Sequence, residues 1–177
     1  AWITAWAGKS QVLVKYKLCN SNPDQYTAIC VGRSTVELQL AQAAEKTWLG
    51  ANEALAGGRD GWLHQGLYLH HAYQDIPGAV KAGAGSSVLW TGSGPKDRPA
   101  GWLAAGGVFV CDKLFAANPA RRLALRGNRL TVEGIAERFP GAPDAKFRGK
   151  SPVGQPWRAE GFWLYDCSHH TSEYLFD

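Results

Sequence analysis

Glycine and proline limit how much helix this chain can form. The 177 residues include 21 Gly and 9 Pro, and both residue types favour turns and interrupt regular helices. We therefore expect many turns and a fold in which long helices do not dominate. A chain of this length fits one domain with a substantial buried core, so residues 1–177 are predicted to form a single domain.

Short strands are predicted at several points along the chain. Residues 11–18 alternate in part, with Val12, Val14, Tyr16 and Leu18 on one face, and this alternation is typical of a strand. Short apolar runs predict further strands over residues 86–91, 107–110, 162–165 and 174–176. Residues 61–72 mix apolar and histidine side chains and allow no assignment.

One long helix is predicted in the N-terminal half, over residues 34–55. Apolar residues recur there at helical spacing, Ser34 or Thr35 is a suitable N-cap, and Gly57 and Gly58 follow as a stop signal. Two shorter helices are predicted, starting at Asn118-Pro119 and at Thr131. The predicted fold class is therefore α+β: a single compact mixed domain with short strands, one long helix and two disulfides.

The cysteine count and the absence of Met indicate an exported chain. The sequence has no Met, so Ala1 is interpreted as the first residue of a mature, secreted or periplasmic protein after removal of a signal peptide. Four Cys then fit two disulfides. We predict Cys19–Cys30, which would close a turn-rich stretch, and Cys111–Cys167, which would tie the middle of the chain to its end. Reduced cytosolic thiols are the alternative.

Charge and hydropathy narrow the function classes. The net charge is +4 and the basic residues are scattered, so there is no strong nucleic-acid signal. No apolar run approaches the length of a membrane span. The His and Cys residues lack metal-ligand spacing, so no metal site is predicted. Signatures of serine hydrolases, P-loop proteins and dinucleotide-binding proteins are also absent from the sequence.

Separated segments of the chain each carry an aromatic residue or a carboxylate. The sequence holds eight Trp, and the segments contain Trp90 with Thr91, Trp157, Glu133 and Glu173. An aromatic wall beside a carboxylate suits a flat cationic heterocycle leaving a sugar, because the ring stacks on indoles and the carboxylate stabilises the developing positive charge. Each residue also has an ordinary interpretation: core packing for the two Trp, a carboxylate at a helix N-terminus for Glu133, and a solvated face for Glu173.

These segments resemble the ADP-ribosyl cyclase and NAD glycohydrolase family. In that family a Trp-Ser motif at a strand end is followed by a Thr-Leu-Glu-Asp segment, an Asn-Pro-Val segment leading to a second Trp, and a final catalytic Glu. The similar segments here are Leu89-Trp90-Thr91-Gly92, Thr131-Val132-Glu133-Gly134, Ser151-Pro152-Val153 with Trp157, and Ser172-Glu173-Tyr174. Thr91 stands in place of the serine, and Gly134 in place of the acidic residue.

The resemblance implies a secreted NAD glycohydrolase that cleaves NAD to nicotinamide and ADP-ribose and acts as a toxin. NAD is then the substrate, and no cofactor is implied. Trp90, Thr91 and Trp157 would bind the substrate, with the two indoles stacking on the nicotinamide. Glu133 would accept a hydrogen bond from the carboxamide, and Glu173 would stabilise the oxocarbenium-like transition state. The expected partner is this small nucleotide; the sequence does not tell whether an inhibitory protein partner exists.

Two other functions stay open. A secreted Trp-rich module would bind carbohydrate or peptide through its indoles and carry out no chemistry. An ADP-ribosyltransferase would consume NAD with the same carboxylate but needs a protein or nucleic-acid acceptor. Comparing the binding of NAD with the binding of sugars separates the binding module from the two enzymes.

Overall fold

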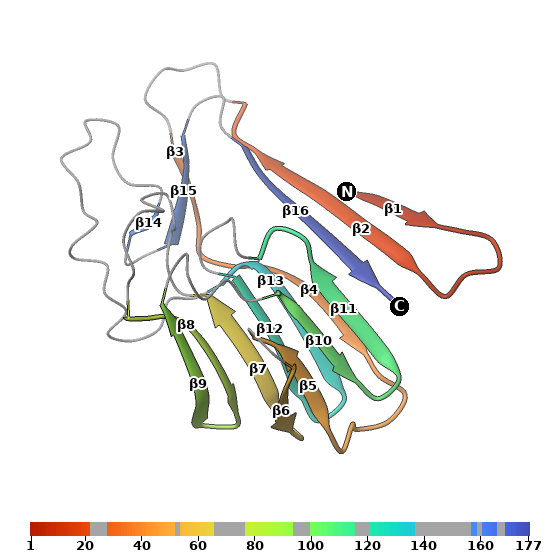
Figure 1. The fold of residues 1–177 in the computed structure, drawn as a ribbon. Coiled ribbons are helices and arrows are strands. Elements are labelled where there is room, and N and C mark those ends of the chain that lie inside the picture. Colours follow the sequence, from red (N-terminus) through yellow and green to blue (C-terminus); the bar gives the residue numbers. More distant parts are fainter. Residues whose placement is uncertain are drawn as a thin grey trace.

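The chain forms antiparallel β-sheets (Figure 1). In the computed structural model the described residues are 1–21, 28–51, 54–65, 77–93, 100–115, 121–136, 157–158, 161–165 and 169–177. Strands β1 to β16 lie in these ranges, and the ranges contain no helix. A membrane-spanning helix is accordingly absent from this part of the chain.

The strands belong to three sheets. The seven-stranded sheet contains, in spatial order, β1 (Trp2–Ala5), β2 (Val12–Cys19), β16 (His169–Phe176), β11 (Val108–Asp112), β10 (Trp102–Ala105), β5 (Thr47–Gly50) and β6 (Ala54–Gly58). The six-stranded sheet contains β4 (Ser34–Gln39), β13 (Arg129–Ile135), β12 (Arg121–Arg126), β7 (Gly61–Gln65), β8 (Pro77–Ala84) and β9 (Ser87–Ser93). The three-stranded sheet contains β14 (Trp157–Arg158), β15 (Gly161–Tyr165) and β3 (Ala28–Val31).

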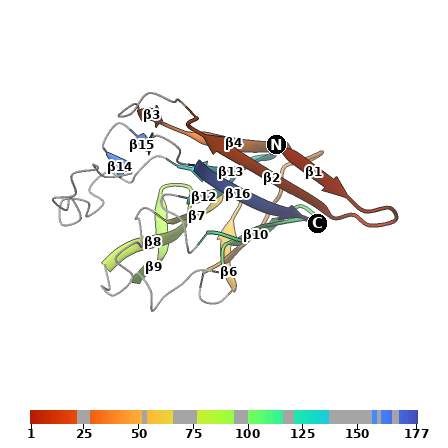
Figure 2. The same cartoon turned by 90° about the horizontal axis from the view of Figure 1, so that it is seen from above.

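The seven- and six-stranded sheets pack face to face as a β-sandwich. One apolar cluster joins Leu49, Leu103 and Val110 of the first sheet to Leu63 and Leu123 of the second, and all five side chains are fully buried. Removing these side chains from water is the main force that holds the sheets together. The β1–β2 hairpin and the three-stranded sheet lie at opposite ends of the molecule (Figures 1 and 2).

Alternation along each strand decides which side chains lie between the sheets and which lie on an outer face. In β16, His170, Ser172 and Tyr174 are buried between the sheets, whereas His169 and Glu173 point to the other side. Each outer face is thus built from every second residue of its strands. Whether a residue lies in the core or on an outer face therefore follows from its position along the strand.

Glycine closes the hairpin between β10 and β11. Gly106 and Gly107 are the two connecting residues, and both have positive φ, at 57° and 80°. A two-residue hairpin turn with two positive φ angles is the type that matches the twist of the strands, and glycine adopts it without steric cost. The high glycine content of the sequence thus serves, at Gly106 and Gly107, to form a tight turn between two strands.

Several predicted strands are confirmed. The predictions over residues 11–18, 86–91 and 107–110 correspond to β2, β9 and β11, and those over 162–165 and 174–176 lie in β15 and β16. Residues 61–65, which allowed no assignment, form β7. In each case a short apolar or alternating run lies between turn residues, which is the pattern that identifies strands best.

The predicted α+β class is wrong, because the described residues are all-β. Residues 34–55 form β4, β5 and the start of β6 instead of a helix. Val36 and Leu38 pair with Val132 and Leu130, about a hundred residues later, and this long-range partner overrides the local helical spacing. The two short helices are also wrong, because residues 121–126 form β12 and residues 131–135 belong to β13.

Both predicted disulfides are wrong as well. Cys19 and Cys111 are free thiols. Cys19 ends β2, whose neighbours are β1 and β16, so it lies opposite His169, while Cys30 belongs to β3 in a different sheet. Cys111 is half-buried in β11, and burial together with Asp112 raises the pKa of its thiol. Cys167 lies outside the described residues.

Candidate functional site

Trp90 and Thr91 are adjacent on β9 and therefore point to opposite sides of the six-stranded sheet. Trp90 packs against the main apolar cluster. Thr91 is exposed and lies opposite Lys81 of β8. The indole of Trp90 thus contributes to packing between the sheets, which agrees with its ordinary structural interpretation.

Glu133 lies on the outer face of the six-stranded sheet. Its neighbour Val132 is part of the core, so alternation turns Glu133 away from it, next to Thr35 and Arg122 on the adjacent strands. The carboxylate is buried and forms an ion pair with Arg33. Glu133 is therefore a paired strand carboxylate and not one that faces a helix N-terminus.

Glu173 lies on the outer face of the other sheet. Its carboxylate is 3.2 Å from Nζ of Lys113 and 3.9 Å from Nζ of Lys15. Glu133 and Glu173 thus occupy different sheets, on faces that point away from each other. The structure brings none of Trp90, Glu133 and Glu173 together.

Two of the predicted segments cannot be placed beside these residues. The backbone of Trp157 lies in β14, paired with Phe162, and its side chain lies outside the described part of the chain. Residues 137–156, which include Ser151-Pro152-Val153, also lie outside the described residues.

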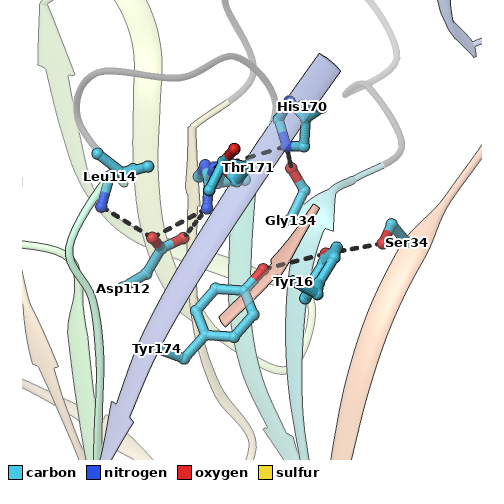
Figure 3. A network of polar contacts seen from close by, with 9 residues as sticks. Tyr16, Ser34, Asp112, Leu114, Gly134, His170, Thr171 and Tyr174 are labelled. Carbon is cyan, nitrogen blue, oxygen red and sulfur yellow. Dashed lines mark hydrogen bonds and ion pairs between the residues drawn. The ribbon is translucent and has the colours of Figure 1, made fainter. Parts of the chain in front are cut away.

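A buried polar junction joins the two sheets beside β16 (Figure 3). Nη1 of Arg121, on β12, donates to both carboxylate oxygens of Asp112, on β11, at 2.9 and 2.7 Å. Nη2 of Arg121 donates to the carbonyl of Thr171 at 3.0 Å, and the amide of Leu114 donates to Asp112 at 2.9 Å. Burial raises the pKa of the Asp112 carboxyl, and Arg121 opposes that rise. The two buried charges are therefore paired and hydrogen-bonded, as buried charges must be.

His170 extends the polar junction to β13. Its Nε2 lies 2.9 Å from the carbonyl oxygen of Gly134, so Nε2 carries a proton and donates it to that oxygen. Burial and the positive charge of Arg121 lower the pKa of His170 to about 4. The imidazole is therefore neutral at neutral pH.

Hydroxyl groups crowd around Gly134. The hydroxyl oxygen of Tyr16 is 2.7 Å from Oγ of Ser34 and 3.3 Å from the hydroxyl oxygen of Tyr174. A Cβ atom added at Gly134 would overlap the hydroxyl oxygens of Tyr16, Ser172 and Tyr174. Burial raises the pKa of Tyr174, so its hydroxyl stays protonated and uncharged. Glycine is required here because the hydroxyls approach the backbone closely.

The polar junction cross-links the sheets. Its ion pair and the hydrogen bonds from Arg121 to Thr171, from His170 to Gly134 and between Tyr16 and Ser34 all run from one sheet to the other. These groups are engaged with each other inside the sandwich, so the arrangement serves stability and strand register better than it serves a ligand.

An open groove lies on the outer face of the seven-stranded sheet, where β5, β10 and β11 meet. Its volume is about 570 Å³, and it is lined by residues 104–109 with Ser10, Lys46, Trp48 and Asp177. Trp48 lies opposite Ala104, and Ala104 lies opposite Phe109. These three side chains therefore form one row across the sheet, with a small residue between two aromatic rings. Trp48 is 41% exposed, which is unusual for so large an apolar side chain.

Polar groups border the groove at both ends of this row. The backbone of Asp177 exchanges hydrogen bonds of 2.7 and 2.9 Å with Phe109. The carboxylate of Asp177 accepts hydrogen bonds from the Ser10 hydroxyl and from Nε2 of Gln11, and these bonds lower its pKa. At the other end, Nζ of Lys46 lies 4.2 Å from the centre of the Trp48 ring. The groove thus offers a fixed anionic acceptor, a hydroxyl, an ammonium and an exposed indole.

A further aromatic side chain continues this surface beyond the groove. The ring centre of Trp102, on β10, lies 5.8 Å from that of Phe109. The Trp102 indole lies directly over Gly50, where any side chain atom would overlap it. The glycine therefore leaves room for the indole above β5, and the aromatic surface of the outer face extends from Phe109 to Trp102.

Sequence reasoning missed this groove. It assigned Trp48 to the apolar face of a helix and did not single out Phe109 or Asp177. A usable signal was present, because Gly106-Gly107 between two apolar runs is a strong hairpin pattern. That pattern would have placed Phe109 opposite Ala104.

No protein-family model, curated protein or solved structure matches the chain.

Proposed function

We propose that this chain is a binding module that holds a saccharide in the groove beside Trp48. The observation that carries the proposal is the half-exposed indole of Trp48, which lies in a groove bordered by Asp177, Ser10 and Lys46. The sequence left open a Trp-rich module that binds carbohydrate or peptide, and the proposal takes carbohydrate as the ligand.

A sugar ring matches this combination of groups. One face of a pyranose carries C–H groups that pack against an aromatic ring, and its edge carries hydroxyls that need hydrogen-bond partners. The Lys46 ammonium lies 4.2 Å from the centre of the Trp48 ring and covers one face of the indole. A sugar that stacks on this face therefore displaces the ammonium, which can then donate a hydrogen bond to a sugar hydroxyl at the border of the groove. Asp177 and Ser10 would accept and donate hydrogen bonds at the sugar edge.

The groups in the groove favour binding over hydrolysis. Glycoside cleavage generally uses two carboxyl groups, one of which must be protonated to act as an acid. Asp177 is the carboxylate among the described residues that line the groove, and its hydrogen bonds lower its pKa, so it stays ionised. An ionised carboxylate suits it to accept hydrogen bonds from sugar hydroxyls.

The NAD glycohydrolase stays a prediction. It requires Trp90, Trp157, Glu133 and Glu173 around one ligand, and no contact among the described residues favours that arrangement. An assay for nicotinamide release from NAD tests it on the same protein preparation.

Isothermal titration calorimetry tests the saccharide proposal. The probes are soluble hexasaccharides of β-1,4-linked glucose, xylose and N-acetylglucosamine. At least one should bind the wild type, and Trp48→Ala should weaken that binding about five-fold or more, because about 1 kcal/mol or more of stacking is lost.

Leu89→Ala is the control, because Leu89 is also a large exposed apolar side chain but lies on β9 of the other sheet, away from the groove. It should bind the hexasaccharide like the wild type. Equal affinity of Trp48→Ala and the wild type, or no binding of any of the saccharides, would reject the proposal.

A further inference from the structure

The N-terminal strand β1 presents an unusual surface. It is the end strand of the seven-stranded sheet, and all four of its residues are exposed. Trp2 is 61% exposed, Ile3 72%, and Trp6, just after the strand, 45%. Large apolar side chains so exposed on a sheet edge mark a surface that pairs with another strand.

The edge lacks the usual protection against pairing. Soluble proteins block edge strands with charged side chains, proline or bulges. Residues 2–6 contain no charged residue and no proline, and β1 pairs with β2 in regular register without a bulge. The backbone edge of β1 that faces away from β2 is therefore open to a partner strand.

The sequence of this edge is nearly symmetric about Thr4. It reads Trp2-Ile3-Thr4-Ala5-Trp6, with Trp at both ends, a small or β-branched apolar residue next to each, and Thr in the centre. In an antiparallel pair of identical strands centred on Thr4, Thr4 would lie opposite Thr4 and Ile3 opposite Ala5 of the second copy. Trp6 follows β1, and its carbonyl accepts the amide of Lys9 at 3.1 Å, so Trp2 would lie opposite Trp6 of the second copy once pairing extends the strand by one residue. Cross-strand aromatic pairs of this kind stabilise sheets.

The charges around β1 are compatible with this pairing. Lys15 lies opposite Trp2 on β2. In the paired arrangement, the row of side chains would run from Lys15 through Trp2 to Trp6 of the second copy. The two copies of Lys15 would then lie at the ends of different rows, and residues 2–6 carry no charge themselves, so no like charges lie directly opposite each other between the two β1 strands.

We propose that two copies of this chain associate through β1, in antiparallel register centred on Thr4, to form one continuous sheet. A two-fold axis perpendicular to the sheet relates the copies, as in closed symmetric dimers. The contact is small compared with interfaces of stable dimers, which bury about 1,200 Å² or more. Association through a four-residue strand is therefore weak and depends on the protein concentration.

The symmetry has a consequence for the outer face. Because the two-fold axis is perpendicular to the sheet, the outer faces of both copies point in the same direction. The two Trp48 grooves would then face the same way, which allows one long polymer to contact both and raises the apparent affinity. The association itself does not depend on the proposed saccharide binding.

Sedimentation velocity over a range of protein concentrations tests this proposal. The wild type should shift from the monomer value towards the dimer value as the concentration rises. Thr4→Glu should remain monomeric throughout, with association at least about ten-fold weaker, because it places two carboxylates opposite each other. Thr91→Glu is the matched control, since Thr91 is an exposed strand residue on the other sheet, and it should associate like the wild type.

Mixing two charge variants makes the test specific for the register. Thr4→Glu and Thr4→Lys should each be monomeric, whereas an equal mixture should associate, because opposite charges then meet across the axis. Circular dichroism checks that each variant keeps its strand signal; if the Thr4 variants lose it, Trp6→Ala replaces them and should be monomeric. A wild type that stays monomeric, association of the blocking variant equal to the wild type, or an equal mixture that does not associate would overturn the proposal.

Discussion

The packing of the polar junction requires glycine at position 134. Three hydroxyl groups, from Tyr16, Ser172 and Tyr174, occupy the space that a Cβ atom would need. The Gly134 carbonyl also accepts the hydrogen bond of His170. All three hydroxyls come from the seven-stranded sheet, so a side chain at Gly134 would push that sheet away from β13.

We expect Gly134→Ala to destabilise the fold by about 1–3 kcal/mol, the usual cost of overpacking a buried site. Urea unfolding followed by circular dichroism measures this change. Gly32→Ala is the control, because no atom lies within 4 Å of a Cβ at that position, and its stability should change little. Equal stability of Gly134→Ala and the wild type would show that the hydroxyls move aside at no cost.

His170 should make stability depend on pH. Its pKa in the folded state is lowered to about 4 by burial and by Arg121, with His169 adding to the effect, whereas an unfolded histidine titrates near 6.5. Between pH 4 and pH 6.5, His170 is protonated in the unfolded chain and neutral in the folded chain. The free energy of unfolding therefore contains the whole contribution of neutral His170 above about pH 6.5. This contribution falls as the pH drops towards 4, by up to about 1.4 kcal/mol per pH unit.

His170→Gln should reduce that slope, because glutamine keeps a donor for the Gly134 carbonyl but does not titrate. Urea unfolding of both proteins at pH 7, 6 and 5 checks this. His64 is a second buried histidine whose pKa is lowered, to about 3, so part of the slope should remain. Identical slopes for the variant and the wild type would mean that His170 titrates normally in the folded chain.

Among the elements, the hairpin of β10 and β11 and the neighbouring strand β5 form the groove. Gly50, on β5, leaves room for the Trp102 indole to lie on the sheet beside Phe109. The aromatic area next to the groove therefore depends on a residue without a side chain.

Gly50→Ala should displace the Trp102 indole and weaken saccharide binding by about three-fold or more, while the sheet register is kept. Near-ultraviolet circular dichroism reports the changed Trp environment, and calorimetry with the tightest hexasaccharide reports the affinity. Gly32→Ala again serves as the control and should change neither signal. A Gly50→Ala variant that binds like the wild type would exclude the Trp102 area from the site.

Short strands were predictable from the sequence, and their long-range partners were not. Residues 11–18 and 86–91 carry local signals that survive in β2 and β9. Residues 40–46 contain good helix formers, yet they form a connection in which the amide of Leu40 donates to Asn128 and that of Ala44 to Gly127. Those acceptors lie more than eighty residues away, so no local pattern could reveal them.

At the scale of the molecule, only the pairing of Ala104 with Phe109 in the β10–β11 hairpin could be predicted from the sequence, and the rest of the site could not, for a related reason. The row takes Trp48 from β5, Ala104 and Phe109 from the β10–β11 hairpin, and Asp177 from the residue after β16. Trp48 and Asp177 are far from the hairpin in the sequence and form no motif with it. The predicted residues Trp90, Glu133 and Glu173 were chosen from local motifs, and the sandwich distributes them over the core and two outer faces. Export of the chain stays a prediction that is independent of the groove.

The most direct test of the saccharide groove uses the Trp indoles as reporters. In a ¹H–¹⁵N correlation spectrum, each Trp gives an indole N–H signal that can be assigned by substitution. Titration with the tightest hexasaccharide should shift the indole signal of Trp48 and the amide signals of Phe109 and Asp177, and should leave the indole of Trp90 unchanged. Shifts centred on Trp90, or saturation with saccharide without any shift at Trp48, would contradict the account.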